Sequence, residues 1–364
     1  MTKTIGIGII GAGFARSTQI PGFKNCEGAR ILAIASARRE HAAEVAREFD
    51  IPNVEGDWRG VVARDDIDLV SIVTPVVTHC EMTLAALDRG KAVLCEKPMA
   101  MNADEARRMA DRAKQAGVLG LIDHELRFLP GRLKMREIIQ GGELGKIKHA
   151  GVIFRADSLA DQNRPWNWWS DEKQGGGALG AIASHIVDGF RWMLSAEVDE
   201  VMCNLSTHIR NRKDHDGKSR PVTTDDEANL LLRFTSELTE GATGNVSISM
   251  VEAGKPLHRF EVFGEHGALR VEGDGELWRA TVGKGDWQRV EVDRNQLAPG
   301  MSDNGWARGF AKFAQKIVGT LRDGQTILDG AATFEDGYRT QLVLDAARKS
   351  NRSRRSESPA VAGS

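Results

Sequence analysis

The chain has 364 residues, of which 41% are hydrophobic and 27% are charged, so it can bury the cores of two ordinary globular domains. A formal net charge of -2 excludes a global field that would attract nucleic acid or an anionic membrane. The N-terminus lacks the pattern of a secretory signal peptide, and no apolar run approaches the roughly 18 residues of a membrane span, so we expect a cytoplasmic protein. The four cysteines form no C-x-x-C pair, so we expect neither a disulfide framework nor a metal site.

The first predicted element is an apolar strand over residues 5–10 that ends in Gly11-Ala12-Gly13. The residues from Ala15 to Lys24 read as a helix, with Phe14 at the turn. In such a strand–turn–helix unit, Gly11 would permit the tight turn, and Gly13 would let the backbone approach a pyrophosphate at the helix start. Arg16 occupies the third glycine position of the G-x-G-x-x-G pattern. The pattern favours a dinucleotide site over a glycine turn without a ligand.

The second predicted strand, residues 30–35, ends in Ser36-Ala37-Arg38-Arg39. An acidic residue here would accept a hydrogen bond from the ribose 2′-hydroxyl of NAD. A small hydroxyl residue and two arginines suit a 2′-phosphate better, so the sequence favours NADP over NAD. The alternative is that Arg38 and Arg39 are solvated residues that open the next helix.

Further buried strands are predicted over residues 68–74, 92–95 and 118–122, separated by helices. This alternation predicts a parallel sheet of βαβ units. Ligands bind outside the carboxyl edge of such a sheet. The strand ends supply candidate cofactor contacts there: Thr74, Pro75, His79, Glu96 and Lys97.

The pattern changes near Gly141. A strand over 147–154, a Trp-rich loop and a helix over 180–194 precede a series of extended runs joined by turns, which predicts a mostly antiparallel sheet. Two amphipathic helices follow, over 306–321 and 330–350. We therefore predict a dinucleotide-binding domain over 1–125, an α+β domain over 126–350 whose last helix can pack on the first domain, and a disordered tail over 351–364.

Two side chains are candidates for the chemistry. Lys97, in CEKP at the end of a buried strand, could donate to a substrate oxygen and stabilise charge developing on it. The alternative is a surface Lys–Glu pair beside a turn proline. His185 lies on an apolar helix and has a suitable intrinsic pKa for a general base. The alternative is a satisfied core histidine.

The remaining candidates are substrate contacts. Trp166, Trp168 and Trp169 precede the Gly175-Gly176-Gly177 run and could pack on sugar C–H faces, or serve core packing or a subunit interface. Arg127 could line a cleft or brace the domain junction. Arg155 and Ser184 complete the predicted substrate set.

Four separated motifs together resemble the Gfo/Idh/MocA family: IGIIGAGFAR at the start, VTPVVTH at 73–79, CEKPMA at 95–100 and GGGALGAIASHIVD at 175–188. The resemblance spans nearly the whole chain. It implies a Rossmann domain followed by an α+β domain whose open sheet forms homodimers or homotetramers. It also implies hydride transfer between NAD(P) and a hydroxyl carbon of a sugar, glycoside or cyclitol.

By position, Lys97 resembles the family lysine that polarises the reacting hydroxyl, and His185 resembles the helix histidine that acts as acid or base. Ala181 stands where the family often has an aspartate, so the Asp–His pair is absent, and the base is either His185 alone or Lys97 in its neutral form. Two alternatives to a dehydrogenase remain open. One is an enzyme that uses bound NAD transiently for elimination or hydrolysis of a glycoside, and the other is a non-catalytic nicotinamide sensor.

Overall fold

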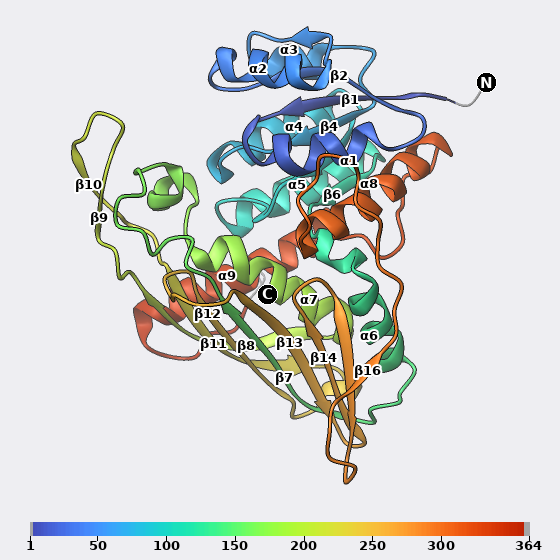
Figure 1. Cartoon of the computed structure of the whole chain (residues 1–364), viewed down its shortest axis with the longest axis vertical. Coiled ribbons are helices and arrows are strands. Elements are labelled where there is room, and N and C mark those ends of the chain that lie inside the picture. Colours follow the sequence, from blue (N-terminus) through green and yellow to red (C-terminus); the bar gives the residue numbers. More distant parts are fainter. Residues whose placement is uncertain (1–2, 360–364) are drawn as a thin grey trace. The chain divides into compact units, whose positions relative to one another are not determined.

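The computed structural model describes residues 3–359 and divides into two compact units (Figure 1). The first unit comprises Met1–Leu129 and Arg294–Tyr338, and the second comprises Pro130–Asp293 and Arg339–Ser364. Each unit is therefore built from two chain segments. We expected a single boundary after residue 125, whereas the chain leaves the first unit after Leu129 and returns to it at Arg294.

The first unit contains a six-stranded parallel sheet in the order β3-β2-β1-β4-β5-β6. Its strands are β1 (Ile5–Ile10), β2 (Ala29–Ala35), β3 (Asn53–Val54), β4 (Leu69–Ile72), β5 (Ala92–Cys95) and β6 (Gly120–Ile122). Its α-helices are α1 (Ile20–Lys24), α2 (Arg39–Phe49), α3 (Trp58–Ala63), α4 (His79–Asp88), α5 (Ala103–Ala116) and α8 (Gly305–Arg322). Short turns of other helix types are η1 (Ala15–Gln19), η2 (Val76–Thr78) and η3 (Glu125–Phe128). The predicted Rossmann-type sheet is confirmed.

Helices cover both faces of β1, which explains its uninterrupted apolar sequence. On one face, the isoleucines of β1 join a core cluster with α1 and α8, in which Phe23 and Phe310 meet edge to face at 5.3 Å. On the other face, Gly8 lies against α3, since a Cβ there would come within 2.4 Å of Val61 Cγ1. Glycine in this strand therefore permits close helix packing.

The second unit contains an eight-stranded sheet in the order β16-β15-β14-β13-β7-β12-β11-β8, in which only β7 and β12 pair in parallel. The strands are β7 (Ile147–Arg155), β8 (Glu197–Ser206), β11 (Glu227–Thr235), β12 (Thr243–Ser249), β13 (Leu257–Gly264), β14 (Gly267–Glu272), β15 (Glu276–Thr281) and β16 (Gln288–Val290). A separate hairpin pairs β9 (Asn211–Lys213) with β10 (Ser219–Pro221). The helices are α6 (Pro130–Gln140) and α7 (Ser184–Leu194), with the short η4 (Trp168–Ser170), η5 (Glu172–Gln174), η6 (Leu179–Ala183) and η7 (Glu237–Thr239). The predicted α+β domain with a large, mostly antiparallel sheet is confirmed.

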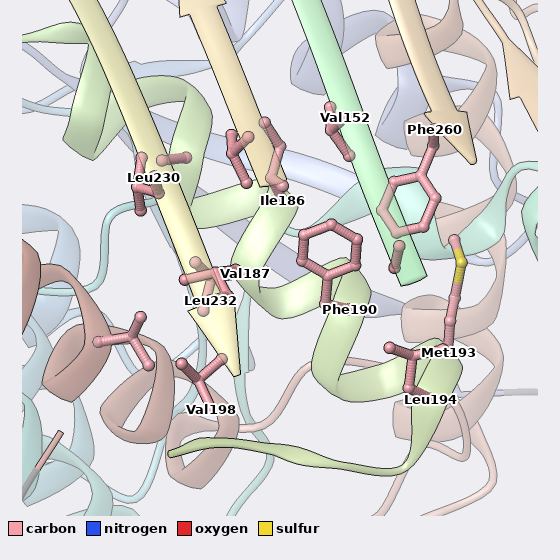
Figure 2. Close-up of a cluster of buried hydrophobic side chains, with 14 of the residues drawn as sticks. Val152, Ile186, Val187, Phe190, Met193, Leu194, Val198, Leu230, Leu232 and Phe260 are labelled. Carbon is pink, nitrogen blue, oxygen red and sulfur yellow. The ribbon is translucent and has the colours of Figure 1, made fainter. Parts of the chain in front are cut away.

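The core of this unit forms where α7 packs on one face of the eight-stranded sheet (Figure 2). Phe190 of α7 is fully buried, and its ring lies 4.8 Å from that of Phe260 and 5.4 Å from that of Phe234. Residues of β11 alternate, so that Leu230 and Leu232 face α7 while Leu231 is 60% exposed. The sheet therefore has one face buried by α7 and one face open in the single chain.

The C-terminal segment differs from its prediction. Helix α9 (Phe334–Ser353) begins in the first unit and continues in the second. Beyond it, the backbone of Glu357 exchanges two hydrogen bonds of 2.9 Å with Val201 on the edge strand β8. Residues 351–359 thus have defined structure where we expected a disordered tail, because the helix extends past Ser350 and the edge strand offers unpaired backbone groups. Residues 360–364 lie outside the described residues. Across the part of the chain described, no helix is both long and apolar enough to cross a bilayer.

Candidate active site

The glycine turn after β1 has the backbone geometry that a dinucleotide site requires. Gly11 has φ +103°, and a Cβ there would lie 2.0 Å from the Val73 carbonyl oxygen, so only glycine fits. Its N–H donates to the Ala35 carbonyl oxygen at 2.8 Å, which ties the turn to the end of β2. At Gly13, by contrast, a Cβ would meet nothing within 4 Å. The turn is therefore rigid at Gly11 and open at Gly13, where a pyrophosphate could approach the backbone, so these residues fit a dinucleotide.

The helix that follows this turn begins as a π-helix, η1, before α1 continues it. Phe14 is 39% exposed at its start, whereas Ala15 is fully buried. Arg16, at the third glycine position, points to α2 and forms ion pairs with Glu44 at 3.1 Å and Glu48 at 2.7 Å. Arg16 thus ties η1 to α2 by exposed ion pairs.

The end of β2 presents the predicted 2′-phosphate contacts. Ser36 is half-buried, and both Arg38 and Arg39 are exposed at the start of α2. Neither guanidinium forms a hydrogen bond or an ion pair with any residue that the structure describes. Two uncommitted cations at this strand end agree with a phosphate-bearing ligand, and also with simple solvation.

His79 joins two of the predicted loops. Its ring nitrogens lie 2.9 Å from the Thr74 carbonyl oxygen and 3.1 Å from the Pro98 carbonyl oxygen, and the side chain is buried. Burial lowers the pKa of His79, which favours a neutral ring that donates to one of these oxygens at a time. Thr78 donates to the Thr74 hydroxyl at 2.8 Å, and Pro75 lies between them in the chain. The ring of His79 therefore holds the 74–79 loop and the 96–98 loop together.

Glu96 and Lys97 follow β5, and Glu96 belongs to a buried network that the sequence did not predict. The amide nitrogen of Gln19 donates to Glu96 Oε1 at 2.9 Å and to Asp123 Oδ2 at 2.7 Å. Ser71 of β4 donates to Gln19 Oε1 at 2.5 Å. Burial raises the pKa of both carboxyl groups, and that of Asp123 lies well above its ordinary value. The one available sequence signal was Ser71, a polar residue inside an apolar strand.

In the second unit, His185 lies in the first turn of α7, directly after the π-helix η6. The exposed fraction of His185 is 2%, and Ser184, Ala181 and Asp188 are buried as well. Both predicted functional helices therefore begin with a π-helical turn, the local distortion that is frequent at functional sites.

Asp225 caps the entry to this helix, a role that no sequence pattern indicates. Leu179 N–H donates to Asp225 Oδ2 at 2.6 Å, and Ala178 N–H donates to the Asp225 carbonyl oxygen at 2.9 Å. Gly177 has φ +111°, and a Cβ there would lie 2.5 Å from Asp225 Oδ1. Burial raises the pKa of Asp225 to about 6. Gly177 thus allows the partly buried carboxyl group of Asp225 to hold the segment that presents His185.

Hydrogen bonds join one tryptophan of the Trp-rich loop to the β9–β10 hairpin. Trp166 N–H donates to the Lys213 carbonyl oxygen at 2.7 Å, and its ring Nε1–H donates to that of Pro221 at 3.0 Å. Trp168 and Trp169 are half-buried and lie 5.3 Å apart between ring centroids. Trp166 therefore fastens the loop to the hairpin, and the other two rings keep partly open faces.

The two arginines of the predicted substrate set have partners inside their own units. Arg127 is buried, donates to the Gly330 carbonyl oxygen at 3.5 Å and lies 3.5 Å from an Asp336 carboxylate oxygen. These contacts hold Arg127 within the first unit. Arg155 donates to the Ser247 carbonyl oxygen at 2.8 Å and pairs with Glu252 at 2.8 Å.

The first unit thus gathers the predicted cofactor residues at the carboxyl ends of β1, β2, β4 and β5, which share one edge because the strands are parallel. The substrate candidates from Arg155 to His185 belong to the second unit. Among the described residues, no group of three or more His, Cys, Asp or Glu side chains could hold a metal ion.

Comparison with known families also divides the chain into an N-terminal and a C-terminal domain. Residues 5–124 match the model of the oxidoreductase family with an NAD-binding Rossmann fold, and residues 133–270 match the Gfo/Idh/MocA C-terminal domain. The chain belongs to the Gfo/Idh/MocA family of oxidoreductases. The expectation of an oxidoreductase with an NAD-binding Rossmann domain is confirmed.

Among curated Gfo/Idh/MocA relatives, an uncharacterized oxidoreductase from Synechocystis is 32% identical over 96% of this chain and 95% of its own length. Levoglucosan dehydrogenase from Pseudarthrobacter phenanthrenivorans is 30% identical over 86% of this chain and 85% of its own length. Among solved structures, levoglucosan dehydrogenase in complex with NADH and levoglucosan has a TM-score of 0.86 at 26% identity, covering 98% of this chain and 99% of that one. An oxidoreductase domain protein from Kribbella flavida has a TM-score of 0.88 at 26% identity, covering 99% and 100%.

Proposed function

We propose that this family member is a dehydrogenase that transfers a hydride between NAD or NADP and a hydroxyl carbon of a pyranose, glycoside or cyclitol. One observation carries the proposal: Lys97 follows β5 at the same sheet edge as the open turn at Gly13. A cation at that edge could act on a substrate oxygen close to a bound dinucleotide. The resemblance to levoglucosan dehydrogenase supports a sugar as the substrate class.

In the proposed oxidation, the Lys97 ammonium donates a hydrogen bond to the reacting hydroxyl oxygen and stabilises the negative charge that develops there. His185 accepts the hydroxyl proton, a role that suits an imidazole. Because Ala181 replaces the family aspartate, His185 would work without a carboxylate from that position. The bound dinucleotide supplies the ring that exchanges the hydride. We assign the first unit to the cofactor and the second to the substrate.

Cofactor choice rests on opposing observations. The uncommitted guanidinium groups of Arg38 and Arg39 favour NADP, because arginine pairs well with a 2′-phosphate. The levoglucosan dehydrogenase structures contain NADH, which favours NAD. The proposal therefore includes both cofactors, with NADP favoured by the residues of this chain.

We further propose a homodimer or homotetramer that forms through the open face of the eight-stranded sheet. That face exposes Leu231 at 60% and Met202 at 45%, beside Asn229 and Asn245. Exposed apolar side chains on a broad sheet suit a contact between two copies. A cytoplasmic location is also proposed, because all four cysteines are buried and none forms a disulfide.

The test is turnover of purified protein with NAD or NADP and a panel of pyranoses, glycosides and cyclitols that includes levoglucosan. Absorbance of reduced nicotinamide that grows beyond one equivalent per subunit is the expected result. A signal that stops at one equivalent while the sugar continues to change would support the transient use of bound NAD instead. No reduced cofactor with any member of the panel would refute the proposal.

A further inference from the structure

Four polar side chains of the first unit meet in the interior beside the chain segment that carries Lys97. Gln19, Ser71 and Asp123 are fully buried, and Glu96 is 8% exposed. Buried polar groups persist where hydrogen bonds replace those lost to water. The contacts of these four residues therefore show which groups donate and which accept hydrogen bonds.

Ser71 fixes the orientation of the Gln19 amide. The Ser71 hydroxyl donates to Gln19 Oε1, so both amide hydrogens remain for the two acids, Glu96 Oε1 at 2.9 Å and Asp123 Oδ2 at 2.7 Å. With the amide reversed, its oxygen would face the Glu96 carboxylate, which has no hydrogen to donate. Gln19 is therefore a bidentate donor that holds the two acids in one network.

The two carboxyl groups differ in the neighbouring charges that act on them. Burial raises both pKa values, and the negative charges of Glu125 and Glu96 raise that of Asp123 further. The positive charge of Lys97 acts in the opposite direction and lowers the pKa of Glu96. Burial and its two acidic neighbours therefore favour the protonated form of Asp123, whereas the charge of Lys97 favours the ionised form of Glu96.

Glu96 also touches the backbone of the lysine, because Lys97 N–H donates to Glu96 Oε2 at 3.3 Å. One carboxyl group thus contacts Gln19 through one oxygen and Lys97 through the other. This geometry links the buried network to the residue that we assign to the substrate oxygen.

We propose that Gln19, Glu96 and Asp123 are positioning residues for Lys97. The carboxyl groups of Glu96 and Asp123 share one proton, so that a single carboxylate charge faces Lys97. The inference rests on the proposed role of Lys97. A lysine ammonium has three N–H donors, so one adjacent carboxylate can orient it while a donor remains for the substrate. Two ionised carboxylates would hold it more tightly and would repel each other in a buried site.

The first experiment detects the shared proton without any turnover. Infrared difference spectra at neutral pH compare wild type with Asp123→Asn, and the control is Glu81→Gln, which removes an exposed carboxylate from α4. We expect the carbonyl band of a protonated carboxylic acid in wild type and in the control, and its loss in Asp123→Asn. Absence of the band in wild type, or its persistence in Asp123→Asn, would overturn the proposal.

The second experiment measures the pH dependence of kcat, and circular dichroism checks the fold of each variant. Wild-type turnover should fall on the acid side as Glu96 becomes protonated. Glu96→Gln should lower kcat by about a hundredfold and remove that acid limb. Charged and titratable groups close to Glu96 include Cys95, Lys97 and Asp123. Glu125 acts on Asp123, and His79 lies beside Lys97.

Asp123 offers a matched pair of variants. Asp123→Asn can still donate to Glu96, as a protonated acid does, so it should retain most of the turnover that Asp123→Leu loses. Equal losses in both variants, or an unchanged kcat and acid limb in Glu96→Gln, would contradict the positioning role. A protein that shows the acid band but oxidises no sugar would refute the proposed function and not the shared proton. An active enzyme that lacks the carbonyl band would refute the shared proton and not the proposed function.

Discussion

Asp225 offers a sharp test of how the His185 helix is held. Its carboxyl group is partly buried, accepts the Leu179 N–H at 2.6 Å and lies against Gly177. Asp225→Asn keeps an oxygen that can accept the same hydrogen bond and removes the ionisable group. The variant therefore tests the effect of the ionisable group while the hydrogen bond to the helix entry is kept.

The magnitude follows from the pKa of Asp225, which burial raises from 3.8 to about 6. A group whose pKa is raised on folding stabilises the protein below the unfolded pKa, and this contribution is lost as the pH rises through the folded pKa. The shift corresponds to about 3 kcal/mol, of which about 2 kcal/mol is lost between about pH 4.5 and pH 8. The stability of Asp225→Asn relative to wild type should therefore increase by that amount as the pH rises.

The assay is chemical denaturation of wild type and variant across this pH range, followed by tryptophan fluorescence. The control is Asp199→Asn, which changes an exposed aspartate of β8 in the same unit. Its free energy of unfolding should depend on pH in the same way as that of wild type. Parallel curves for wild type and Asp225→Asn would refute the reasoning, because they would show that Asp225 does not resist ionisation in the folded protein.

Three further outcomes are expected. Phe190→Ala should lower the free energy of unfolding by about 3–5 kcal/mol in urea titrations, since the buried ring contacts the core on the sheet; a loss below about 1 kcal/mol would contradict the packing described. Combined Arg38→Ser and Arg39→Ser should weaken NADP binding by about tenfold and leave the Kd for NAD nearly unchanged, and calorimetry that finds equal changes would remove the arginines from cofactor choice. Leu231→Asp should reduce the oligomer observed by light scattering, and an unchanged mass would exclude this sheet face as the contact.

The sequence was most informative where local chemistry decides the structure. The apolar run of β1 is typical of a strand covered on both faces, and Gly11 after it marks a turn that no side chain fits. The spacing of strands and helices likewise predicts the parallel sheet, and hence the edge at which Lys97 and the glycine turn both lie. These are consequences of short-range pattern and of βαβ geometry.

The sequence was uninformative where side chains far apart in the chain meet. Gln19 and Asp123 are 104 residues apart, and Asp225 is 46 residues from the helix entry that it caps. Their roles depend on burial and on the direction of each side chain, which no spacing reveals. The π-helical turns before α1 and α7 also have no sequence signature, because they change only the backbone hydrogen-bond partner.

The segment after Ser350 shows a similar effect of context. Its polar composition predicts disorder, yet Ser350 Oγ accepts the Cys203 N–H at 2.9 Å and the backbone of Glu357 pairs with β8. A free sheet edge can thus order a segment whose own composition favours no structure.

Lys97→Met tests whether Lys97 stabilises the reacting oxygen of a sugar hydroxyl. The measurement pairs kcat for the best sugar of the panel with the Kd for NADH from fluorescence titration. We expect a loss of about 10²–10³ in kcat and a Kd within about threefold of wild type, because the removed donor acts on the substrate. An unchanged kcat would contradict the claim, and so would a loss of turnover that a weaker Kd for NADH accounts for entirely.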